Sequence, residues 1–207
     1  HLQEVDAEKT GEEFDVNQYF TVLTHLSVEA SYVLDYVYFY DSSDSWPIIY
    51  ARQKEEEPYV NHSEYLEENA PEESHNEYLE HVETDGSAEG YFEWVVLAIQ
   101  GHQFYLGWHA NYSDTTVLCS HEAVERVIEQ ANDFGSQMTS EQEQKALELD
   151  LEPSVEFERE TVQVRIVTFT KWGGFFEETF LISRESPHRI VKHTTEELVP
   201  YNSGVMF

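Results

Sequence analysis

The feature that most constrains the fold of this chain is its excess of acidic residues. Forty-two Asp and Glu face eleven Lys and Arg among 207 residues, which gives a formal net charge of −31 at pH 7. Self-repulsion of this size destabilises a compact state, so folding requires a substantial apolar core. Apolar residues make up 40% of the sequence and aromatic residues 14%. We therefore expect a folded globular protein and not a disordered chain.

The same charge excludes several classes of partner. Affinity for phosphate groups rests on Lys and Arg, so neither direct nucleic-acid binding nor binding to anionic membranes is expected. No apolar run approaches the ~18 to 20 residues that span a membrane. The single cysteine, Cys119, is expected to be a small buried residue on a strand, and it fits a reducing, cytoplasmic compartment. The chain begins with His1 and not Met, which leaves open a preceding segment.

Length and residue patterning predict one α+β domain with an acidic insertion at about 55–89, two packed lobes being the alternative. Residues 1–14 show no sustained period and are expected to form a loose N-terminal segment. Asp15 is expected to cap a short helix. Further on, Ser120 caps a helix at 121–132, and Ser140 opens another at 140–149.

Three hairpins are expected to build a mainly antiparallel sheet, because runs rich in aromatic and β-branched residues flank short turns. The paired strands are 32–40 with 46–51, 91–100 with 103–110, and 155–170 with 175–183. Short additional strands are expected at 115–119 and 189–193.

The insertion contains thirteen acidic residues and no Lys or Arg, and it holds the near-repeat 62–67 and 75–80. Each unit has the signature of a capped helix, with Asn61 or Ser74 placed three residues before a Glu. Two short amphipathic helices would then turn Tyr65, Leu66, Tyr78, Leu79 and Val82 inward and their glutamates outward. The candidate residues for binding a partner are Glu55, Glu56, Glu57, Glu64, Glu67, Glu68, Glu72 and Glu73.

A search for catalytic, metal and cofactor motifs finds none, and no catalytic residue, metal site or cofactor is predicted. The ten histidines are poorly spaced for ligation; His102 and His109, for example, point to opposite faces of a strand. An aromatic band is the best candidate for a ligand cleft, although core packing explains the same residues. Its members are Trp94, Tyr105, Trp108, His109 and Trp172.

Four runs of sequence resemble a family of bacterial proteins of unassigned function. They are residues 32–38, 104–112, 167–174 and 200–207. The resemblance covers the chain from about residue 15 onward. It implies no activity, cofactor or catalytic residue.

These features favour a non-enzymatic acidic protein that presents its insertion to a basic partner, as an inhibitor or immunity-type protein does. One alternative is an enzyme or small-ligand-binding domain that uses the aromatic cleft. A further alternative is a nucleic-acid mimic, whose carboxylates imitate phosphates. Adaptation to high salt fits the acidity less well, because Glu outnumbers Asp 33 to 9 and large aromatic residues are abundant.

Overall fold

A computed structural model describes residues 4–41, 44–69, 76–108 and 114–205. Helices alternate with antiparallel sheets, which confirms the predicted α+β class. The chain divides into two compact units, His1–Asn111 with Glu185–Arg189, and Tyr112–Arg184 with Ile190–Phe207. They are called unit 1 and unit 2 below. The single domain with its N-terminal segment and insertion stays a prediction.

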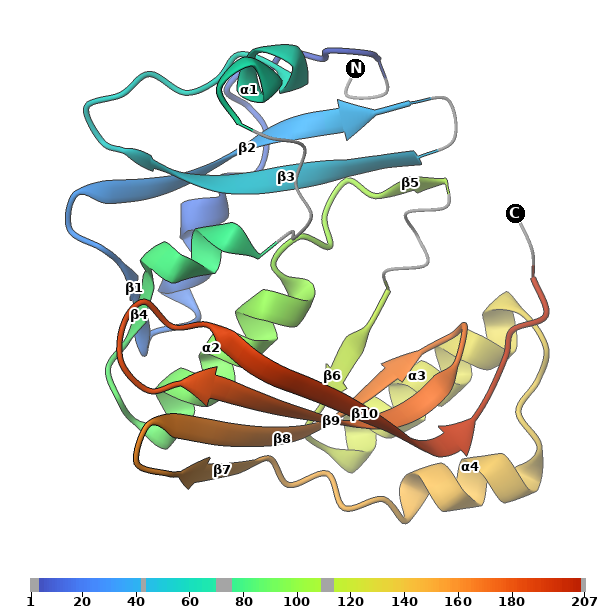
Figure 1. Cartoon of the computed structure of the whole chain (residues 1–207). Coiled ribbons are helices and arrows are strands. Elements are labelled where there is room, and N and C mark those ends of the chain that lie inside the picture. The colour runs from blue at the N-terminus through green and yellow to red at the C-terminus, as the bar shows by residue number, and fades with distance from the viewer. Residues whose placement is uncertain (1–3, 42–43, 70–75, 109–113, 206–207) are drawn as a thin grey trace. The chain divides into compact units, whose positions relative to one another are not determined.

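Unit 1 is built on a three-stranded sheet in the order β2-β3-β5 (Figure 1). Strand β2 (Tyr32–Tyr40) pairs along its whole length with β3 (Asp44–Gln53), which confirms the first predicted hairpin. Strand β5 (Gly107–Trp108) pairs with the first two residues of β3. Of the strand predicted at 103–110, this two-residue piece is all that forms within the described part, since residues 109 and 110 lie outside it.

Two 3-10 helices and two short strands make up most of the remaining structure of unit 1. The 3-10 helix η1 (Val16–Thr21) is capped by Asp15 as predicted, because the Asp15 carboxylate accepts from the Asn17 N–H at 2.9 Å. Strand β1 (Leu26–Val28) pairs antiparallel with β4 (Val82–Thr84), which directly follows the 3-10 helix η2 (Glu77–His81).

Residues 91–100 belong to helix α2 (Ala88–Gln100), so the prediction of a second hairpin is wrong. Their aromatic and β-branched composition favours a strand when each residue is taken singly. However, the Ser87 hydroxyl caps the first turn by accepting from the Gly90 N–H at 2.9 Å. Burial of one helical face then outweighs the intrinsic preference. The buried residues of that face, at i, i+3, i+4 and i+7, are Tyr91, Trp94, Val95 and Ala98.

Unit 2 contains a five-stranded antiparallel sheet in the order β10-β9-β8-β6, with β7 also paired to β8. Strand β8 (Thr161–Thr170) and β9 (Gly174–Ser183) form the third predicted hairpin, which is confirmed. Gly174 has a φ of 103°, and a Cβ there would lie 2.2 Å from the Val199 carbonyl oxygen, so the turn requires glycine.

The other strands of this sheet differ in length from the predictions. The run predicted as one strand at 155–170 is split, because β7 (Ser154–Phe157) turns back at 158–160 and pairs with β8. Strand β6 (Thr116–Leu118) agrees with the prediction at 115–119, but Cys119 lies just beyond it and is exposed, not buried. Strand β10 (Ile190–Pro200) is longer than predicted because β9 supplies a partner along nearly its whole length.

Helices α3 (His121–Phe134) and α4 (Ser140–Leu147) pack on the sheet of unit 2 (Figure 1). Ser120 caps α3 as predicted. The capping box of α4, however, is formed by Thr139 with Gln142, one residue earlier than the predicted Ser140 with Glu143. The core of unit 2 consists of Leu118, Val124, Val127, Ile128, Ala131, Met138, Ala146, Leu151, Val167, Phe169, Phe175, Val199 and Tyr201.

Candidate functional site

The acidic segment that follows β3 contains most of the predicted partner-binding residues. Helix α1 (His62–Glu68) forms where the first repeat predicts it. The described candidates are all exposed: Glu55, Glu56, Glu57, Glu64, Glu67 and Glu68. Glu72 and Glu73 lie outside the described residues, as does Ser74, the predicted cap of the second helix.

Helix α1 is held in place by a cap and one buried side chain. The Asn61 carboxamide accepts from the Glu64 N–H at 3.0 Å, and the Glu64 carboxylate accepts from the Val60 N–H. Tyr65 is 3% exposed and packs between Tyr50 and Tyr59, with ring centroids 5.5 Å from each. A seven-residue helix is not stable alone, so this anchor determines where α1 lies.

The prediction of inward-facing apolar residues is only partly correct. Leu66 is 38% exposed, because the short helix buries a single position against the sheet and that position is taken by Tyr65. In the second repeat unit, Tyr78 and Leu79 of η2 are buried as predicted. Val82 is also buried, but it lies in strand β4 and not on the predicted helix.

Half of the described candidate carboxylates have a structural role inside the segment. Glu64 completes the helix cap, Glu56 accepts from the Gln53 N–H at 3.2 Å, and Glu68 accepts from the Tyr59 hydroxyl at 2.9 Å.

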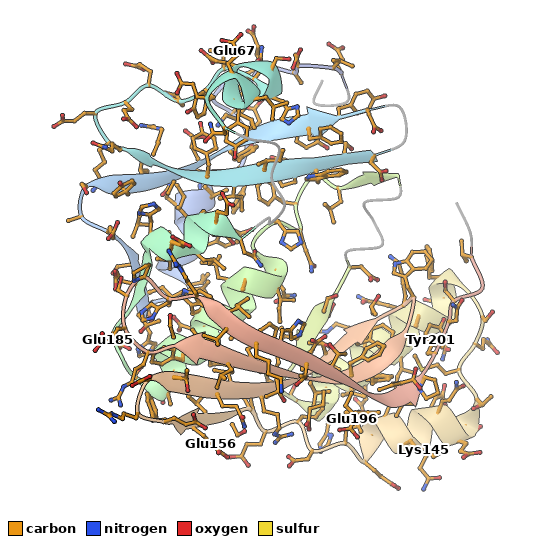
Figure 2. All side chains as sticks on the ribbon, viewed as in Figure 1. Glu67, Lys145, Glu156, Glu185, Glu196 and Tyr201 are labelled. Carbon is orange, nitrogen blue, oxygen red and sulfur yellow. The ribbon has the colours of Figure 1, made fainter. Side chains whose placement is uncertain are left out.

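The other half, Glu55, Glu57 and Glu67, have no hydrogen-bond or ion-pair partner in the described part of the chain. Glu67 projects outward from α1 in Figure 2. No Lys or Arg pairs with any of the six carboxylates among the described residues, so their negative charge is not neutralised locally.

A second acidic surface lies between α3 and α4 in unit 2, and sequence reasoning did not select it. Glu125, Glu129 and Asp133 recur every four residues along the exposed side of α3, a spacing readable from the sequence. They line a groove of about 360 Å³ with Glu143, Ile128 and Leu147. Asn132 joins the two helices by donating to the Glu143 carboxylate at 3.0 Å and accepting from the Met138 N–H at 2.7 Å.

The described members of the predicted aromatic band pack in three different surroundings. Trp94 is 1% exposed in the core of unit 1, with its ring near His188. Tyr105 is 43% exposed in unit 1 and contacts Phe104. Trp172 belongs to unit 2, where it packs edge-to-face on Phe134 at 5.8 Å.

Two members of the band cannot be placed in this way. Trp108 contributes its main chain to β5, and its side chain lies outside the described part. His109 lies outside the described residues altogether.

Histidine–carboxylate pairs flank the β1–β4 ladder of unit 1. His25 Nδ1 lies 2.8 Å from Asp85 Oδ2, and this hydrogen bond raises the pKa of His25. Hydrogen bonds from Ser87 and His25 lower the pKa of Asp85 to about 2. His81 Nδ1 lies 2.7 Å from Glu29 Oε2. These are pairs, and within the described residues no group of three or more His, Cys, Asp or Glu is arranged to hold a metal ion.

Comparisons with protein-family models, curated proteins and solved structures find no match. The resemblance to a bacterial family of unassigned function therefore stays a prediction. The described part of the chain contains no helix with the length and apolarity needed to cross a membrane.

Proposed function

We propose that this chain is a non-enzymatic acidic binding protein that engages a basic protein partner through α1 and the loop before it. One observation supports the proposal above the others. Glu55, Glu57 and Glu67 are exposed and have no partner in the described part of the chain, while the segment that carries them is anchored by Tyr65.

Anchoring matters because binding energy is lost when a flexible segment must be ordered. Here Glu56, Glu64 and Glu68 hold the loop and helix through hydrogen bonds, which leaves the other three carboxylates available on a formed surface. A complementary basic surface would associate faster and more selectively with such an arrangement. An inhibitor or an immunity-type protein uses surfaces of this kind to engage its target.

The charge of the chain also supports the class of partner. A basic protein is attracted by a net charge of −31, whereas nucleic acid and anionic lipid are repelled. A cytoplasmic location is part of the proposal, and it is supported by the free, exposed thiol of Cys119.

The test compares two variants with the same change in charge. The first replaces Glu55, Glu57 and Glu67 with Gln, which leaves the three structural glutamates intact. The matched control carries Glu125→Gln, Glu129→Gln and Asp133→Asn on α3. Because exposed ion pairs contribute about 0.2 to 1 kcal/mol each, loss of three should weaken binding of a basic partner by about 0.6 to 3 kcal/mol, or about three- to 150-fold.

The readout is affinity capture from source-cell lysate with wild-type protein and both variants, followed by titration of the captured basic protein. We expect capture to be reduced and the titrated affinity to fall in the α1 variant, and both to be kept in the α3 control. An equal reduction of capture in both variants would mean that net charge alone drives binding. A reduction of capture in the α3 control alone would assign the function to the α3–α4 groove. If DNA competes for the captured protein, the function is nucleic-acid mimicry.

A further inference from the structure

Unit 1 contains a cavity of about 390 Å³ whose walls include no residue of α1. Its walls are Lys9, Gly11, residues 13–17, residues 33–36 of β2, and Arg52 of β3. Cavities that bind small molecules span about 300 to 1,000 Å³, so this one has the size for a small metabolite. We call it the Asp35 cavity.

Two of the eleven basic residues of the chain converge on one carboxylate in this cavity. The Lys9 ammonium donates to Asp35 Oδ1, and Arg52 Nε lies 3.3 Å from Asp35 Oδ2. Lys9 also lies 4.4 Å above the centre of the Tyr36 ring. All three charged side chains are largely buried, so two positive charges face one negative charge at this end of the cavity.

Three carboxylates line the cavity, those of Asp35, Glu13 and Asp15, and each already accepts hydrogen bonds from the protein; Asp15 accepts from the N–H and the side-chain amide of Asn17. Asp35 accepts from the Tyr36 N–H as well as from Lys9 and Arg52. Glu13 accepts from the Thr10 N–H, the Thr10 hydroxyl and the Gly11 N–H. Desolvation acts to raise the pKa of Glu13, but these hydrogen bonds outweigh it and lower the pKa to about 2. Most of the acceptor capacity of Asp35 and Glu13 is therefore used within the protein.

Several donors of the cavity have no protein acceptor. In the described part of the chain, Arg52 Nη2 and the other Lys9 N–H groups have no protein acceptor. The Tyr36 ring belongs to the cavity wall, but its hydroxyl is buried away from the open space and is out of reach of a ligand.

We propose that the Asp35 cavity binds a small organic carboxylate. The ligand carboxylate accepts from the N–H groups of Lys9 and Arg52 that have no protein acceptor. Phe14, Val16 and Leu34 of the cavity wall suit an apolar body. Salt screens charges beyond about 8 Å at physiological ionic strength, so the charges that act on the ligand are chiefly those of the cavity itself.

Three probes of the same shape test the charge of the ligand: benzoate, benzamide and benzylamine. Each is titrated into the full chain at physiological salt, by calorimetry and by amide chemical shifts of residues 9–17 and 33–36. We expect benzoate to bind at least about tenfold more tightly than benzamide, and benzylamine more weakly than either. Equal binding of benzoate and benzamide, or tightest binding of benzylamine, would overturn the proposal, as would the absence of any shift at these residues.

Variants separate ligand binding from folding. The thermal midpoint of each variant is measured beside its affinity for benzoate, so that a loss of folding is distinguished from a loss of binding. Lys9→Met should weaken binding about tenfold. The matched control is Lys54→Met, since Lys54 is exposed and donates to the Ala30 carbonyl outside the cavity. If the control weakens benzoate binding as much as Lys9→Met, the cavity is not the site.

Discussion

Replacing Tyr65 with Ala tests whether this one side chain holds helix α1 and its exposed glutamates in place. Tyr65 is almost completely buried against Val37, Ile48 and Tyr50. A buried aromatic side chain covers about 150 Å² or more, and at roughly 25 cal/mol per Å² its removal costs about 3 to 4 kcal/mol. Measured costs of truncating buried aromatic residues to Ala are about 3 to 5 kcal/mol, which agrees.

The Tyr65→Ala substitution should unfold helix α1 without unfolding the rest of the chain. Without Tyr65 a helix of seven residues does not remain folded, so the amides of α1 should lose protection from hydrogen exchange while those of β8 and β9 keep theirs. Binding of the basic partner should weaken as well, because the carboxylates would no longer be fixed. Leu66→Ala is the matched control, and its cost should be about 1 kcal/mol since Leu66 is more than one-third exposed.

Hydrogen exchange followed by mass spectrometry, with urea unfolding of wild type and both variants, provides the measurement. Unchanged protection of α1 in the Tyr65→Ala variant would refute the anchoring argument. An equal loss of stability in Leu66→Ala would also refute it, because the two neighbours would then be equivalent.

Three further outcomes are expected. In urea unfolding, Thr139→Ala should lower the free energy of unfolding by about 1 kcal/mol and Ser140→Ala by much less, because Thr139 is the cap of α4. A larger loss for Ser140→Ala would instead support the cap predicted from sequence. In an NMR titration, Asp85→Asn should lower the pKa of His25 toward its ordinary value. Since the folded-state pKa of His25 is raised, its pairing with Asp85 stabilises the fold below the unfolded pKa, and this is lost as pH rises through the folded pKa. The thermal midpoint should rise between about 10 mM and about 1 M NaCl as salt screens the net charge, and an unchanged midpoint would contradict strong self-repulsion.

Local signals predicted several elements well. The first hairpin, helix α3 with its Ser120 cap, and helix α1 with its Asn61 cap form where the sequence indicates, because their turns and caps depend on neighbouring residues. The exposure of the described glutamates after β3 also agrees with the prediction, since an acidic segment free of Lys and Arg is rarely buried.

The candidate sites were harder to predict from the sequence. The Asp35 cavity joins Lys9, in a segment expected to be loose, to β2 and Arg52, and no local period connects these positions. The row of carboxylates on α3 was readable at four-residue spacing, but its groove depends on the packing of α4. In the aromatic band, composition alone did not distinguish a buried core residue such as Trp94 from a surface residue such as Tyr105.

The sequence by itself determined the charge, the class of fold and the elements whose caps and turns are local. Tertiary structure decided the rest. It made residues 91–100 part of a helix, because burying one helical face of Trp94 and its neighbours outweighs their preference for strands. It also decided which glutamates remain unpartnered and which cations meet at Asp35, because side chains distant in sequence become neighbours only when the chain has folded.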